Sequence, residues 1–131
     1  MKKTSVCLVL LLVLFLTCGR SAQALSPPAW ILGTWADQFG ANTWVFTEDN
    51  VVYRVWARYT DGSVTVIDFK QGSQMRGVTV LEESTALTYI LAVIEAGGEI
   101  RLKFVKTSDT TLDSSRIDTP TDEEPIPLMK Q

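Results

Sequence analysis

The sequence predicts an all-β protein, an eight-stranded antiparallel up-and-down barrel preceded by a cleaved signal peptide. Three observations predict this class. Apolar and polar residues alternate along several short stretches, turn-forming residues separate these stretches, and no stretch after residue 25 has helical periodicity. An open meander of this length would leave two edges of unpaired backbone groups, and closure into a barrel removes them. A two-layer sandwich is the alternative architecture.

The first 24 residues predict a signal peptide. Lys2 and Lys3 precede an uninterrupted apolar run at 6–16, and residues 22–24 read Ala-Gln-Ala, the small-x-small pattern of signal peptidase cleavage. The run is shorter than the roughly 20 apolar residues that span a membrane. We therefore expect a secreted or periplasmic protein that begins at Leu25. Lipidation at Cys18 is the alternative, and only then would we expect membrane attachment, although the residues before this cysteine fit a lipoprotein signal poorly.

Composition bounds the function of the mature chain. Removal of 24 residues from 131 leaves 107, which favours one domain, and the leader takes with it three of the twelve basic residues and none of the fifteen acidic ones. The resulting net charge of −6 disfavours a nucleic-acid partner. Without histidine or cysteine, the common triads, thiol chemistry and most zinc sites are excluded, so we predict no catalytic residue, metal or cofactor.

Each expected element follows from a local pattern. The segment 26–32 begins with two prolines, which resist regular strand pairing, and is expected to continue as a short helical turn. The first strand follows it and ends at a turn that contains Gly40. Trp44 and Phe46 share one face of the second strand, which ends at an acidic turn. The third strand alternates apolar residues up to an Asp-Gly hairpin signal at 61–62. The expected strands are 33–37, 42–47, 51–59, 63–70, 74–81, 85–95, 99–106 and 110–117.

The later strands complete the predicted domain at 25–117. A Gln-Gly-Ser turn separates the fourth strand from the fifth, and the sixth is apolar on both faces, which predicts a central, covered position. The seventh and eighth strands alternate between short turns that contain glycine or Thr-Ser-Asp. Residues 118–131 are acidic and proline-rich without apolar periodicity, which predicts a disordered tail.

Gly33-Thr34-Trp35 at the start of an all-β meander resembles the calycin group, and within it small bacterial lipocalin-like secreted proteins are a nearer match than avidins. The resemblance implies that Gly33 and Trp35 close the base of a barrel and that an arginine from the last strand lies across the indole. Arg116 is the matching candidate and Arg101 a weaker one. Avidins share part of this stretch but have asparagine where Asp37 stands, so biotin binding is not expected.

Two orientations of the third strand remain open. The apolar set at 51, 53, 55, 57 and 59 is suited to the barrel interior, which would leave Arg54 and Arg58 outside. In the opposite orientation the two arginines flank Trp56 inside a cavity, where a guanidinium can hold a carboxylate. The candidate ligand-binding residues are Trp44, Phe46, Arg54, Trp56, Arg58 and Tyr89.

These observations lead to two functional hypotheses. The first is a carrier for a small hydrophobic or amphipathic ligand, held inside the barrel. The second is a protein-binding module, such as a secreted inhibitor or surface factor, with a filled barrel that acts through exposed loops. An internal cavity distinguishes them.

Overall fold

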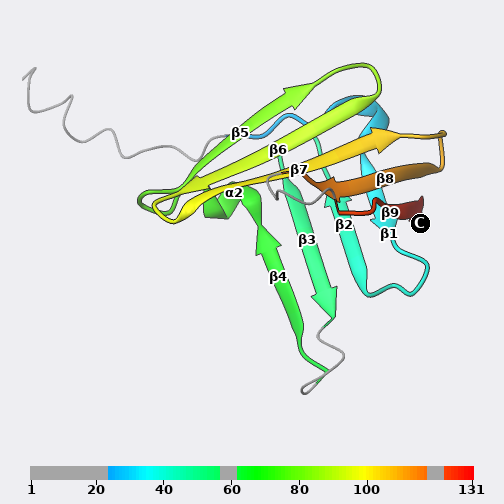
Figure 1. Ribbon diagram of the computed structural model, residues 1–131, viewed down its shortest axis with the longest axis horizontal. Coiled ribbons are helices and arrows are strands. Elements are labelled where there is room, and N and C mark those ends of the chain that lie inside the picture. The colour runs from blue at the N-terminus through cyan, green and yellow to red at the C-terminus, as the bar shows by residue number, and fades with distance from the viewer. Residues whose placement is uncertain (1–23, 57–61, 118–122) are drawn as a thin grey trace, which may run out of the picture.

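The computed structural model describes residues 24–56, 62–117 and 123–131. Within them the chain forms one antiparallel sheet that curls into a half-barrel, which confirms the all-β antiparallel class (Figure 1). Across the sheet the order is β4-β3-β2-β1-β9-β8-β7-β6-β5. The elements are η1 (Ala29–Ile31), β1 (Gly33–Ala36), β2 (Asn42–Phe46), β3 (Val51–Trp56), β4 (Val64–Asp68), α2 (Phe69–Gly72), β5 (Thr79–Ser84), β6 (Thr88–Glu95), β7 (Gly98–Lys106), β8 (Thr111–Arg116) and β9 (Ile126–Lys130).

The predicted signal peptide lies outside the described residues except for Ala24, and Cys18 and Arg58 lie outside them as well. Among the helices in the described ranges, none has the length and apolar character needed to cross a membrane.

The sheet differs from the predicted barrel at the junction between β4 and β5, which are its two edge strands. The predicted fourth strand stops at Asp68, whose carboxylate caps α2 by accepting a hydrogen bond from the Gln71 amide at 2.9 Å. After α2 the chain turns through Gly77, which has a φ of +82° that favours glycine. The predicted fifth strand therefore begins five residues late, at Thr79. The helix and turn occupy the place where a closed ring would pair these two strands.

The end of the chain supplies a ninth strand, so the prediction of a disordered tail is wrong for its last part. β9 lies between β1 and β8 and is antiparallel to both. The Lys130 amide donates to the Thr110 carbonyl and the Gln131 amide to the Thr34 carbonyl, each at 2.9 Å. Leu128 is fully buried in the core. The position beside β1 that an eight-stranded barrel gives to its last strand is therefore held by β9.

Trp35, to which the resemblance assigned the closure of the barrel base, lies in the core beside η1. Its indole is buried and donates to the Ile31 carbonyl of η1 at 2.7 Å. The cation over the ring is Lys130, with its Nζ 5.4 Å from the ring centroid, where the resemblance implied Arg116. Gly33 has a φ of +123°, and a Cβ there would lie 3.2 Å from the Lys130 side chain, so glycine is favoured on both counts.

The core fills the concave face of the sheet. Alternating residues of β2, β6 and β7 point inward, and η1 and the segment before it add apolar side chains from the chain start. The fully buried large side chains are Leu25, Ile31, Trp35, Phe46, Val51, Val80, Tyr89, Leu91, Phe104, Leu112 and Leu128.

Candidate functional site

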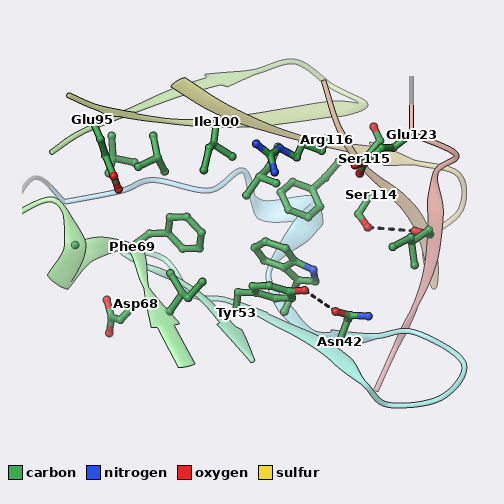
Figure 2. A pocket seen from close by; sticks show the side chains of 18 of the residues that line it. Asn42, Tyr53, Asp68, Phe69, Glu95, Ile100, Ser114, Ser115, Arg116 and Glu123 are labelled. Atoms are coloured by element: carbon green, nitrogen blue, oxygen red, sulfur yellow. Dashed lines mark hydrogen bonds between the residues drawn. The ribbon is translucent and has the colours of Figure 1, made fainter. Parts of the chain in front are cut away.

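The concave face also holds a cavity of about 630 Å³ (Figure 2). Every strand except β1 contributes to its lining, together with α2 and the turn after it. Ligand pockets in proteins commonly measure about 300–1,000 Å³, so the space is adequate for a small organic molecule.

Aromatic rings form one wall of this cavity. The indole of Trp44 stacks on Tyr53, with centroids 4.1 Å apart, and meets the edge of Phe104 at 4.9 Å. Phe69 continues the wall at 6.1 Å from Trp44. Rings at these distances hold one another in fixed orientations, so the wall is rigid and apolar.

Large aliphatic side chains of the lining remain open to solvent. The exposed fractions are 43% for Ile67, 63% for Met75, 40% for Ile100 and 46% for Ile126. Their exposure leaves apolar surface uncovered on the side of the sheet that elsewhere forms the core. A ligand that displaced water from these side chains would gain roughly 25 cal/mol for each Å² of apolar surface it buried.

A short polar relay reaches the cavity at the β2–β3 side. The Tyr53 hydroxyl donates to Asn42 Oδ1 at 2.5 Å, and Asn42 Nδ2 donates to Asp37 Oδ2 at 2.7 Å (Figure 2). Asp37 also accepts backbone N–H bonds from Phe39 at 3.1 Å and Ala41 at 2.9 Å. The carboxylate thus fixes the loop and the amide orientation, and the hydroxyl keeps lone pairs that can accept from a ligand.

Burial, and then the nearby Asp37 charge, raise the pKa of the Tyr53 hydroxyl above its usual value. The phenol therefore stays neutral in the cavity at neutral pH.

Phe69 is held in the wall by the local structure of α2. Asn50, in the turn before β3, accepts the Lys70 amide at 3.0 Å and donates to Asp68 at 3.0 Å. These bonds fasten the helix start to the β2–β3 turn. Phe69, the first residue of α2, is consequently buried with its ring directed into the cavity (Figure 2).

The lining of the cavity contains more acidic than basic side chains. Arg116 on β8 points into the cavity, and Figure 2 shows Glu123 on the same side. The other acids are Asp68, Glu95 and Glu124. In the described part of the chain the lining therefore carries one cation and four carboxylates.

The residues predicted to bind a ligand lie at different depths in the structure, and only some of them line the cavity. Trp44 lines the cavity. Phe46 and Tyr89 lie deeper, buried behind Phe104, and the Tyr89 hydroxyl donates to Glu82 at 2.6 Å. They support the wall without forming its surface.

Arg54 and Trp56 are exposed on the opposite face of β3, so their assignment to the cavity is corrected. The reason is the alternation of the strand: Val51 is buried in the core and Tyr53 lines the cavity, which turns the intervening residues outward.

Several lining residues were not predicted. Tyr53 belongs to the apolar set of the third strand that is suited to the barrel interior, and this is the orientation that the structure shows, although Tyr53 was not named as a ligand-binding residue. Ile100 and Phe104 share one face of the seventh strand with Leu102, so their alternation indicated an inward face. Phe69 was assigned to a strand, and the capping Asp68 before it was the signal for a helix start.

Comparisons with protein-family models, curated proteins and solved structures found no match to this chain. The described sheet, an all-β antiparallel half-barrel, is compatible with a lipocalin-like barrel. Among the described residues no group of three or more histidine, cysteine or acidic side chains could hold a metal ion.

Proposed function

We propose that this protein is an exported, lipocalin-like binding protein that holds a small hydrophobic or amphipathic ligand in the cavity of the half-barrel. The observation that carries the proposal is the gathering of solvent-exposed aliphatic side chains around a rigid aromatic wall in a space of about 630 Å³. Such pockets, apolar with a few fixed polar groups, are typical of small-molecule sites. The relay through Tyr53 supplies a fixed hydrogen-bonding group at one side.

A cavity-filling variant tests the proposal. Ile100→Trp places a large ring in the cavity, and Figure 2 shows that Ile100 points into it. We expect this variant to lose binding of a solvatochromic dye by about tenfold or more, because the ring occupies the volume that the dye needs. Ile117→Trp is the matched control, since Ile117 is similarly exposed and does not line the cavity.

Mass spectrometry of extracts from the purified protein complements the dye assay. The proposal predicts a bound small molecule that the wild type and Ile117→Trp retain and that Ile100→Trp lacks. Equal dye binding by all three proteins, with no extractable ligand, would contradict it.

A protein-binding role is a second candidate, favoured by an exposed patch on the outer face. Trp56 is 54% exposed and pairs with Val64 across β3 and β4, and Val66 is exposed beside them. Exposed apolar patches commonly mark interaction surfaces. Chemical cross-linking in the culture medium would test it: a defined adduct that Trp56→Ser loses and Ile100→Trp keeps would support this role.

A further inference from the structure

We infer that the ligand is an amphipathic organic cation, an apolar or aromatic body that carries an amine or quaternary ammonium group. This inference rests on the proposed function of the cavity and specifies its ligand class.

The lining of the cavity carries a net negative charge. Four carboxylates and one guanidinium give the described lining a formal charge of −3. A concave site with low-dielectric walls concentrates the field of its charges, so this cavity attracts cations and repels an organic acid. The whole chain adds to the effect, since its formal net charge is also −3.

Two carboxylates of the lining lie toward the same end of the cavity as the Phe69 ring. Figure 2 shows Glu95 and Asp68 toward the α2 end of the cavity, where Phe69 is directed inward, the Arg116 guanidinium next to Ile100, and Glu123 toward the opposite end. An ammonium group at the α2 end would contact an aromatic face with carboxylates nearby. Rings stabilise such cations through their quadrupole, by about 0.5–2 kcal/mol in known proteins.

The aromatic wall extends beyond Phe69 and can hold the apolar body of the ligand. From Phe69 the wall continues through Trp44 to Phe104, with ring centroids 6.1 and 4.9 Å apart. This apolar path suits the body of an amphiphile. Tyr53 lies on the same path, and its hydroxyl can accept a hydrogen bond from an N–H group.

The test compares probes that share one alkyl chain and differ only in the head group. We would measure binding of dodecyltrimethylammonium, dodecanol and dodecanoate to the full chain by isothermal titration calorimetry, below micelle formation. We expect the cation to bind about tenfold or more tightly than dodecanoate, with dodecanol between them. The preference should shrink as salt is raised, because salt screens partly exposed charges.

A charge-removing variant locates the preference. Glu95→Gln should reduce the affinity for the cation by about threefold and leave the affinity for dodecanol unchanged. The matched control is Glu83→Gln, an exposed carboxylate on β5 that pairs with Arg101 at 3.4 Å and does not line the cavity. Thermal melts of both variants establish that each is folded.

The outcomes separate this inference from the proposed function. Tighter binding of dodecanoate than of the cation, or equal binding of all three probes, would overturn the cation inference and uphold ligand binding. If no probe binds to the wild type, both the inference and the proposed function fail.

Discussion

Leu128→Ala tests whether the end of the chain completes the core. Leu128 on β9 is fully buried and lies opposite Leu112 of β8. Truncating a buried leucine to alanine removes its transfer free energy and leaves a cavity, which typically costs 2–5 kcal/mol. For this site, held between two strands that cannot easily collapse, we expect a loss of about 3 kcal/mol in the free energy of unfolding. A domain of about 100 residues loses roughly 4–8 °C in Tm for each kcal/mol, so Tm should fall by about 10–20 °C.

Urea titration followed by tryptophan fluorescence and far-UV circular dichroism would measure this change. The matched control is Met129→Ala, because Met129 is the next residue of β9 and is 44% exposed. We expect the control to lose less than about 1 kcal/mol. If the two variants are equally stable, the packing of β9 in the core is refuted.

Three further predictions concern single contacts. Gly33→Ala should cost about 1–3 kcal/mol in urea titrations, because φ is +123° and the new Cβ would crowd Lys130; a neutral result would contradict the strain. Asp37→Ala should lower the free energy of unfolding by about 2–3 kcal/mol and weaken dye binding, because the loop amides and the Asn42–Tyr53 relay lose the carboxylate that accepts their hydrogen bonds. Unchanged dye binding would count against the relay. Burial, and then a hydrogen bond to a carboxylate, raise the pKa of Tyr89. The unfolded tyrosine ionises near pH 10 and the folded one only at higher pH, so the free energy of unfolding should fall progressively as the pH rises above about 10, with a smaller fall in Tyr89→Phe.

The first three strands could be predicted from the sequence because their patterns are local. Trp44 and Phe46 alternate with polar residues, and acidic or glycine turns bound each strand. The Gly-Thr-Trp start likewise indicated a buried indole, and Trp35 is 1% exposed.

β9 could not be predicted because its burial depends on partners far away in the chain. Its segment contains a proline and follows acidic residues, a composition typical of solvated tails. Only the groove between β1 and β8 gives Leu128 a place in the core. In the same way, Lys130 reaches Trp35 through the pairing of the first and last strands, a contact that no local sequence pattern indicated.

The site was predictable in part. Trp44 was named for its inward face, and the strand alternation that directs it into the cavity is visible in the sequence. Arg54 and Trp56 attracted attention as polar and aromatic side chains, but alternation places them with solvent. The charge of the lining comes from residues of separate turns and strand ends, and no single stretch of sequence reveals that sum.

The place of β9 bears on how the molecule is made. β9 follows the other described strands in the sequence and yet lies in the middle of the sheet, so before it is synthesised the half formed by β1 to β4 has no strand pairing with the half formed by β5 to β8. Contacts between the two ends of a chain are also slow to form, because a long loop must close first. The sheet should therefore stay open to chaperones or a translocation channel until β9 has emerged.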